Sequence, residues 1–547
     1  MTDWRTVEQA GTVRAAAPRA RRSSIFHAVR LAGSRPVAAP ELLAVLVAAA
    51  LVIGYLLAGL MGGDLTAQIA RADFAADHPL SPVDLRWFAG FQPFGYSLWT
   101  PWVMAIIGVR VTGAGCTIAA AWLTTRLLRV TGAARPAWGG AAAAITLTSN
   151  LVEGRVTFGC GAALGIAALL LLTRPGPNRR VLASGCAFLA GSASPVAAML
   201  LTVCAVALLS RRRLADAAMV SVPALIPAVA LSLAFADPGR ALFSGNDALR
   251  AIGASVLVAI LVPPRLRMLR LGALLGAALV LAAYLLPSPI GVSAARFSLL
   301  FAVPVVVAFA RVPRGLVPIA VAVTVAVQNP ITFGTLRDVD QPATHASYYR
   351  PLFAAIASHG PVTGRVEIPE LTGHWEAAYV ARELPLARGW IRQTDIGQND
   401  DTFYAHAPTA ASYRTFLDRL AVQYVAVADA RPTFYGRRES RLIAAGLPYL
   451  QRIWTDEHWT LYAVQDAASI VSAPGVLQSS DAASVTLTAP AGTQIRLRLR
   501  WFRWLSLDSA DSGACLYRDG DQVMLRTGTG GIYRLSSELE PHAAVCG

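Results

Sequence analysis

An uncharged, apolar run of 22 residues at positions 42–63 constrains this chain more than any other feature. A helix of that length suffices to cross the hydrocarbon core of a bilayer. Seven arginines lie in the tail before it, and no A-x-A site of the kind that ends a signal peptide is evident. We therefore expect a retained first membrane helix, with residues 1–40 forming a cytoplasmic, arginine-rich tail.

The composition agrees with a membrane protein. Hydrophobic residues make up 55% of the chain, the mean hydropathy is +0.48, and only 15% of the residues are charged, against about 25% in a soluble domain. A soluble fold of this size could not bury so much apolar surface. The net charge of +15 does not indicate nucleic-acid binding, because the arginines cluster between apolar runs, as topology signals do.

These arginine clusters divide the chain up to residue 328 into pairs of apolar segments. Placing every cluster in the cytoplasm predicts eleven membrane helices, which start inside and end outside. The expected helices are 42–61, 112–128, 136–150, 155–173, 180–191, 195–210, 216–235, 251–264, 271–286, 297–310 and 315–328. The least certain pair is 180–210, where 30 residues must form a hairpin rather than one long helix; arginines on both sides favour the hairpin.

From residue 328 onward the composition becomes that of a soluble region. Short apolar strands are expected at 421–428 and 459–464, with a helix between them, which predicts an α/β domain over 329–467. Residues 468–547 alternate apolar and polar side chains, which predicts a β-sandwich-like module. The fold class is therefore a polytopic α-helical membrane domain, 41–328, followed by an extracytoplasmic α/β domain and a β-rich C-terminal module.

The cysteines fall into two groups. Cys515 and Cys546 both lie in the β-rich module, where an oxidising outer compartment would allow them to form a disulfide. The others lie in expected membrane helices and are interpreted as small apolar packing residues: Cys116, Cys160, Cys186 and Cys204. No C-x-x-C motif or histidine cluster predicts a metal site.

The first outer loop carries the richest set of polar residues. Asp64 follows the first helix directly, at the membrane boundary, where partial desolvation is expected to raise its pKa and make it a better proton acceptor. It could equally cap an amphipathic helix over 65–76, and the two interpretations are compatible. Asp73, Asp84 and Trp87 follow in the same loop.

Two further outer loops carry charges. Glu153 and Arg155 either pair only with each other or complete a polar site with Asp64. Arg296, at the outer mouth of a later helix, could hold a lipid phosphate through paired hydrogen bonds. Its alternative is snorkelling to the lipid headgroups.

These residues resemble those of glycosyltransferases with the C-type (GT-C) fold, polytopic enzymes that use polyprenyl-phosphate sugars. The resemblance rests on an aspartate straight after helix one, then W-x-x-G and G-Y-S near a proline. More narrowly, the chain is similar to actinobacterial membrane proteins described as related to 6-pyruvoyl-tetrahydropterin synthase. The segments that carry the resemblance are 62–64, 84–95, 154–158, 296–304 and 375–399.

The resemblance implies an inverting transfer outside the plasma membrane, from a polyprenyl-phosphate sugar to an envelope glycan or glycolipid. Asp64 would be the general base and Glu153 a second acidic residue. Arg296 and Arg155 would compensate the charge of the leaving phosphate. A divalent metal is possible but not expected, since only some GT-C enzymes use one. Sugar, acceptor and linkage stay open.

The 388–399 segment suits sugar binding, because aromatic faces stack on sugars and planar polar groups bond hydroxyls. Its candidate acceptor-binding residues, with Asp73, Asp84 and Trp87 of the first loop, are Arg388, Trp390, Arg392, Gln393, Asp395 and Asn399. The alternative is a structural turn packed on the membrane domain.

Two other function classes stay open. A transporter or permease of envelope precursors is disfavoured by the odd helix count, the absence of an obvious internal repeat and the scarcity of charges within the spans. A non-catalytic envelope assembly factor would result if the site had decayed. Sugar transfer measured after replacing Asp64 by Asn distinguishes these two classes from a glycosyltransferase that uses Asp64 as its base.

Overall fold

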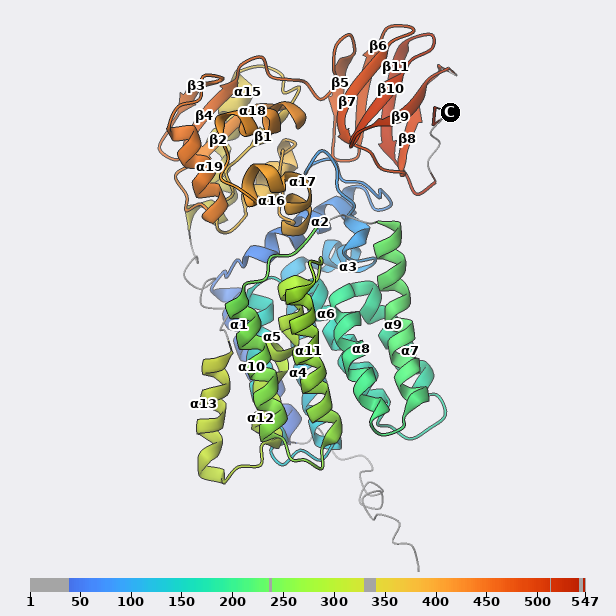
Figure 1. Cartoon of the computed structure of the whole chain (residues 1–547), viewed down its shortest axis with the longest axis vertical. Coiled ribbons are helices and arrows are strands. Elements are labelled where there is room, and N and C mark those ends of the chain that lie inside the picture. Colours follow the sequence, from blue (N-terminus) through green and yellow to red (C-terminus); the bar gives the residue numbers. More distant parts are fainter. Residues whose placement is uncertain (1–38, 236–238, 329–340, 512, 541–544, 547) are drawn as a thin grey trace, which may run out of the picture. The chain divides into compact units, whose positions relative to one another are not determined.

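The computed structural model describes residues 39–235, 239–328, 341–511, 513–540 and 545–546 (Figure 1). From Pro40 onward they belong to one compact unit. The expected cytoplasmic tail lies almost entirely outside the described residues.

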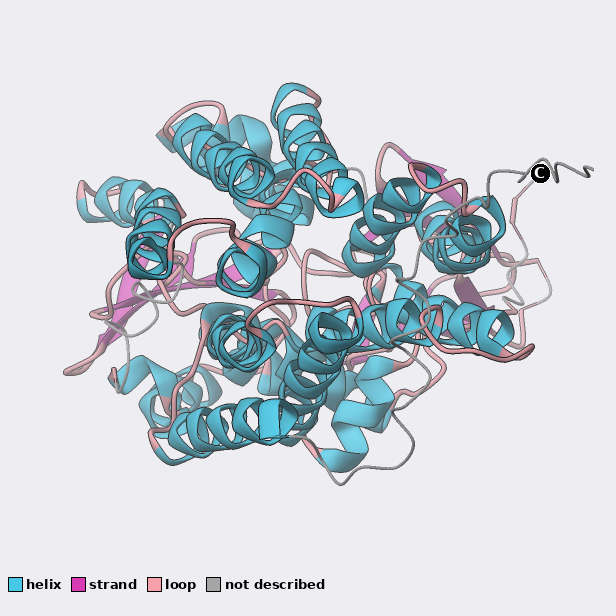
Figure 2. Cartoon of the chain, turned by 90° about the horizontal axis from the view of Figure 1, so that it is seen from below, coloured by secondary structure: helices cyan, strands magenta, loops and turns pink. Residues whose placement is uncertain are grey.

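The first half of the described chain is helical. Viewed after a turn of 90°, many of these helices are seen nearly end on (Figure 2). Their bounds are α1 Ala39–Leu57, α2 Gly63–Asp77, α3 Thr100–Ile107, α4 Val109–Val130, α5 Pro136–Val152, α6 Val156–Leu171, α7 Arg179–Ala193, α8 Pro195–Leu209, α9 Leu214–Ala234, α10 Gly245–Leu261, α11 Arg267–Leu285, α12 Arg296–Phe309 and α13 Val317–Val327. Each expected helix has a counterpart here; α2 was expected only as an amphipathic segment, and α3 was not expected.

The hairpin expected within 180–210 is present as α7 and α8. Extended Ser194 ends α7, and Pro195 occupies the first turn of α8, where its missing N–H costs nothing. Glycines allow these helices to pack closely: a Cβ on Gly161 would lie 2.7 Å from the Ala197 Cβ, and one on Gly191 would collide with the Ala224 carbonyl. Close packing of small residues is typical of membrane helices.

Among the described residues, four helices are long and apolar enough to cross a membrane: α1, α9, α11 and the segment Gly291–Phe309 that contains α12. A fifth results if α3 and α4, which meet at a bend of 111°, count as one span. Shorter apolar helices include α6 and α8. These segments define a membrane protein, whereas eleven crossings and their orientation stay predictions.

The region after the helices contains a four-stranded sheet in the order β1-β2-β4-β3. Only β1 and β2 are parallel. The two strands expected from sequence are the central ones, β2 and β4. The elements are α15 Arg350–Ser358, β1 Arg365–Glu367, α16 Glu376–Glu383, α17 Arg392–Asn399, α18 Ala410–Arg419, β2 Val422–Ala428, α19 Phe434–Ala444, β3 Leu450–Thr455 and β4 Trp459–Val464.

The C-terminal module consists of a three-stranded sheet, β7-β10-β9, and a four-stranded sheet, β5-β6-β11-β8. Alternate residues of both sheets enter one apolar core, including Leu497, Leu525 and Leu535, as the period-two pattern predicts. Cys515 and Cys546 are joined by a disulfide. The strands are β5 Val476–Ser480, β6 Ser484–Ala489, β7 Gln494–Arg500, β8 Leu505–Asp508, β9 Cys515–Asp519, β10 Gln522–Arg526 and β11 Gly531–Ser537.

Short helical turns complete the described elements. They are η2 Pro93–Gly95, η3 Gly291–Ala295, η4 Arg314–Leu316, η5 Pro342–Thr344, η6 Ala346–Tyr349 and the π-helical η7 Asp400–Tyr404.

The segment between α2 and α3 is packed into both C-terminal regions. Val83 and Leu85 belong to the core of the β-module, while Trp87 and Phe88 belong to the core that includes β2, β4 and α16. α2 itself packs against α3 and α16. This segment therefore joins the end of the helical region to residues 341–546, the region that is predicted from sequence to be soluble and is called the soluble region below.

Candidate active site

Two glycines bring the start of α2 against the turn between α5 and α6. A Cβ on Gly62 would collide with the carbonyl of Val152, and one on Gly154, whose φ is +82°, would collide with the backbone of Leu65. The Asp64 N–H donates to the Glu153 carbonyl at 3.2 Å. Because no side chain separates the two backbones, Asp64 is held beside the turn that carries Glu153 and Arg155.

An ion pair joins Asp64 to Arg155. The Arg155 Nε donates to Asp64 Oδ2 at 2.7 Å, and Arg155 Nη2 lies 3.9 Å from Glu153 Oε2. Glu153 and Arg155 therefore do complete a cluster with Asp64 rather than pairing only with each other. Asp64 is the second residue of α2, whose N-cap, Gly62, makes no side-chain cap, so the cap interpretation of Asp64 is wrong.

The ionisation of Asp64 differs from the expectation. Burial alone would raise its pKa, as the sequence suggested, but the positive charges of Arg155 and Arg296 outweigh burial and hold the pKa below its usual value. The expectation of a raised pKa was wrong because it considered desolvation without the guanidinium groups. Asp64 is a carboxylate at neutral pH.

Three guanidinium groups gather around this carboxylate. Arg296 lies with its Cζ 5.0 Å from the centre of the Phe158 ring and interacts electrostatically with Asp64 and Arg155. Arg71 is 2% exposed, lies 3.7 Å over the Tyr96 ring, and its Nε and Nη1 have no hydrogen-bond partner among the described residues. Sequence reasoning missed Arg71, although its position seven residues after Asp64 places it on the same face of α2.

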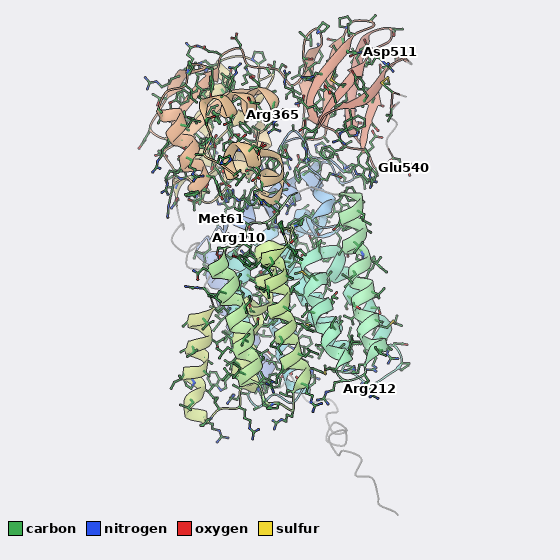
Figure 3. The ribbon with its side chains drawn as sticks, viewed as in Figure 1. Met61, Arg110, Arg212, Arg365, Asp511 and Glu540 are labelled. Carbon is green, nitrogen blue, oxygen red and sulfur yellow. A yellow bond between two sulfur atoms is a disulfide. The ribbon has the colours of Figure 1, made fainter. Side chains whose placement is uncertain are left out.

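A cavity of about 360 Å³ opens beside this cluster. The helical region contributes Met61, which is labelled in Figure 3, together with Gly63, Asp64, Glu153 and Arg155. The soluble region contributes residues 371–375, Trp390 and Arg431, with others from 341–344. Both regions of the chain are therefore needed to build the cavity wall.

His374 is the residue of this wall that sequence reasoning missed. It is 5% exposed and has a φ of +58°, unusual for a residue other than glycine. Its ring stacks on Trp390, with centres 3.3 Å apart and planes 9° apart. Burial and the charge of Arg392 hold its pKa well below the ordinary value, although Asp64 opposes them, so the imidazole is neutral. No periodicity marks this position.

The expected sugar-binding segment divides in two. Trp390 lines the cavity, with one ring face covered by His374. Arg392 pairs with Glu370 at 2.6 Å, and Gln393 Nε2 donates to the Pro289 carbonyl at 3.3 Å, a contact with the helical region.

The other three residues of that segment form a buried network away from the cavity wall. Arg388 is 7% exposed and pairs with Glu367 and Glu439, while Asn399 Nδ2 donates to Asp395 Oδ1 at 2.7 Å. Enclosed partners leave Arg388, Asp395 and Asn399 no surface for a sugar. Their placement fits the alternative of a structural segment.

The first-loop candidates other than Asp64 also lie outside the cavity. Asp84 is 1% exposed and holds Arg86 at 2.7 Å. Trp87 donates its Nε1–H to the Ala377 carbonyl at 2.9 Å. Asp73 pairs with Arg382 at 2.6 Å. The contacts of Trp87 and Asp73 join this part of the chain to α16, whereas the Asp84–Arg86 pair lies within the loop.

In the ranges that the structure describes, no three His, Cys, Asp or Glu side chains come together as a set able to hold a metal ion. The expectation that no divalent metal is required stays a prediction.

Comparison with known proteins finds fold-level similarity at most. No family model and no curated protein matches the chain. Among solved structures, arabinofuranosyltransferase AftD from Mycobacteria is 16% identical over 82% of this chain, with a TM-score of 0.46. ArnT from Cupriavidus metallidurans, in the apo state, is 13% identical over 74% of this chain, with a TM-score of 0.41.

The coverage of these two structures differs. The chain spans 40% of the length of the AftD structure and 94% of that of ArnT. At these levels of similarity, function has to be argued from the site itself.

Proposed function

We propose that this chain is a membrane glycosyltransferase that moves a sugar from a polyprenyl-phosphate donor to a hydroxyl of an envelope glycan or glycolipid. The observation that carries the proposal is one carboxylate, Asp64, held between Arg155 and Arg296 on a cavity shared by the membrane helices and the soluble region. The transfer takes place at the outer face of the plasma membrane and inverts the anomeric carbon.

The charge balance of the cluster suits a lipid phosphate. Arg71, Arg155 and Arg296 bring three guanidinium groups together, against the two carboxylates of Asp64 and Glu153. A buried excess of positive charge is costly unless an anion neutralises it. A phosphodiester bound beside Arg155 and Arg296 would supply that anion, and these groups would stabilise the phosphate as it leaves.

Donor binding also prepares Asp64 as the base. Arg155 and Arg296 lower the pKa of Asp64, which by itself makes the carboxylate a weak proton acceptor. When the donor phosphate takes up part of their charge, the pKa rises and the carboxylate becomes a stronger base. The acceptor hydroxyl then attacks the anomeric carbon, its proton passes to Asp64, and the bond to the phosphate oxygen breaks with its electron pair leaving on the phosphate.

The test is Asp64→Asn, with transfer measured from a polyprenyl-phosphate sugar in membranes or nanodiscs. We expect kcat to fall by a factor of about 10²–10⁴, the usual contribution of a general base, with the fold retained. Asp73→Asn is the matched control, because Asp73 lies on the same helix but pairs with Arg382 outside the cavity.

Transfer by Asp64→Asn at the wild-type rate would exclude Asp64 as the base. A defect in uptake or export of envelope precursors with transfer unchanged would instead favour a transporter.

A further inference from the structure

The conformation of His374 indicates that the chain holds this imidazole in place at a cost. A residue other than glycine at a φ of +58° carries backbone strain. The flat stack on Trp390 fixes the plane of the ring. Strained residues that the surrounding structure holds in place cluster at binding and catalytic sites.

The partner of His374 determines which ring nitrogen carries the proton. Nδ1 lies 3.5 Å from Oε1 of Glu370, a carboxylate that also receives Arg392 at 2.6 Å and the Thr433 hydroxyl at 2.6 Å. A carboxylate facing Nδ1 favours a proton on that nitrogen. Nε2 then presents a lone pair and accepts hydrogen bonds.

The Cδ2–Nε2 edge of the ring lies near the start of α2. A Cβ built on Gly63 would lie 3.7 Å from Cδ2 of His374, the atom bonded to Nε2. This edge therefore lies near Gly63 and Asp64, and all three residues line the same cavity. A neutral hydrogen-bond acceptor and an ionised carboxylate thus lie side by side, with guanidinium groups behind the carboxylate.

We propose that His374 binds the acceptor: its Nε2 accepts a hydrogen bond from a hydroxyl next to the one that Asp64 deprotonates. The site would then select a sugar with two neighbouring hydroxyls over a molecule with a single isolated hydroxyl. This inference rests on the proposed glycosyltransferase activity and extends it to acceptor specificity. It also gives Trp390 a role behind the imidazole rather than as an open sugar-stacking face.

The experiment compares a synthetic acceptor glycoside with its monodeoxy analogues, which each lack one hydroxyl beside the attacked one. In the wild type, one analogue should show kcat/KM lower by about tenfold, as expected for one hydrogen bond. In His374→Asn, kcat/KM for the full acceptor should fall to the value for that analogue, mainly through a higher KM. The kcat/KM for the analogue itself should fall no further.

The choice of variants separates binding from folding. Asn tolerates a positive φ, so His374→Asn keeps the backbone while its shorter side chain loses reach. His374→Gln places an amide oxygen near the position of Nε2 and should restore part of the discrimination. His406→Asn, at an exposed position in the same region, is the control and should behave as the wild type.

Two failures are distinguishable. If the wild type transfers no sugar to any acceptor, the glycosyltransferase proposal fails. If the wild type transfers sugar but His374→Asn discriminates among the deoxy analogues as the wild type does, only the role of His374 is overturned.

A second observation is independent of this site. The Sγ atoms of Cys116 on α4 and Cys160 on α6 lie 2.9 Å apart, whereas both cysteines were interpreted from sequence as packing residues. Cys160 follows Arg155 by five residues on the helix that begins at the cavity. We infer that these thiols form a disulfide that fixes the first turns of α6 to α4: they lose two protons and two electrons to an external disulfide, which becomes two thiols.

The test is treatment of the folded, membrane-embedded protein with oxidised glutathione, followed by maleimide labelling and peptide mass analysis. We expect a cross-linked peptide pair containing Cys116 and Cys160, reversed by dithiothreitol, while Cys186 and Cys204 stay labelled as free thiols. Full labelling of Cys116 and Cys160 after oxidation would overturn the inference.

Discussion

Two of the carboxylate–guanidinium clusters among the described residues differ in their surroundings: one lies on the cavity wall beside Asp64, and the other is buried. The cavity cluster consists of Asp64, Glu153, Arg155 and Arg296, with Arg71 beside it. The buried cluster consists of Glu367, Arg388, Asp395 and Glu439. Residues from both clusters were candidates for substrate binding.

The clusters differ in how their charges are balanced. In the buried cluster, Arg388 lies between two glutamates and 4.0 Å over the Phe403 ring, and Tyr413 donates to Glu439 at 2.9 Å. Burial raises the pKa of Glu367 well above its usual value, although the charge of Arg388 opposes the shift. The cluster is complete within itself. The cavity cluster instead has more cations than anions, and an anionic ligand would complete it.

The largest effect should come from removing the centre of the buried cluster. Breaking a buried ion pair from one side costs about 3–5 kcal/mol, so Arg388→Met should lower the free energy of unfolding of the soluble region by that amount. Asp64→Asn, by contrast, should lower stability by less, because its ion pair with Arg155 is partly exposed, and should lower activity greatly. Thermal unfolding in detergent, followed at several denaturant concentrations, measures the stability of both variants, and the transfer assay measures their activity. Equal stability of Arg388→Met and wild type would remove the distinction between the clusters.

Glu376 sharpens the comparison because it is a buried carboxyl that forms no ion pair within the part of the chain that the structure describes. It is 6% exposed, its Oε1 accepts the Leu371 N–H at 3.1 Å, and burial raises its pKa to about 8. A carboxyl whose pKa is raised in the folded state contributes its full stabilisation below the pKa of the unfolded chain, about 4.3. That contribution is lost as the pH rises through the pKa of the folded state.

Glu376→Gln should therefore gain stability over the wild type by about 1.4 kcal/mol per pH unit between roughly pH 5 and 8.

The pKa of Asp64 is shifted in the opposite direction, because it is lowered in the folded state. The contribution of Asp64 to the free energy of unfolding is therefore lost only as the pH falls below the pKa of the unfolded chain. The stability difference between Asp64→Asn and wild type should thus be flat over the same range. Thermal unfolding of both variants from pH 5 to 9 tests this, and a flat difference for Glu376→Gln would contradict a buried, protonated Glu376.

The sequence predicted the elements of this fold better than the contacts between them. Apolar length, arginine clusters and Pro195 were enough to locate the helices, because these features act locally. The close approach at Gly62 and Gly154 depends on two backbones far apart in sequence, and nothing in either segment alone indicates it. The placement of Asp64 beside Arg155 follows from that approach.

The candidate site shows the same limit. Asp64, Glu153 and Arg155 could be proposed because charges at the ends of apolar runs stand out. Arg388 and Asp395 carry the same chemistry as those three, and only burial distinguishes the two sets. His374 gives no local signal, since its role depends on a left-handed backbone and on Trp390, 16 residues later. Sequence thus locates polar groups, whereas packing decides which of them reach a ligand.

The smallest effect should come from a third carboxylate–guanidinium pair, Asp73 and Arg382, which belongs to neither cluster. Arg382 donates from Nε and Nη2 to Asp73 Oδ2 at 2.8 and 2.6 Å, and its side chain is 48% exposed. Exposed pairs contribute about 1 kcal/mol or less. A double-mutant cycle of Asp73→Asn and Arg382→Gln should give a coupling energy in that range, shrinking further in high salt, with sugar transfer unchanged. A coupling energy above about 2 kcal/mol, or a loss of sugar transfer, would contradict this prediction. The pair would then fix α2 to α16 as firmly as the buried cluster holds its own domain together, and exposure alone would no longer distinguish weak ion pairs from strong ones.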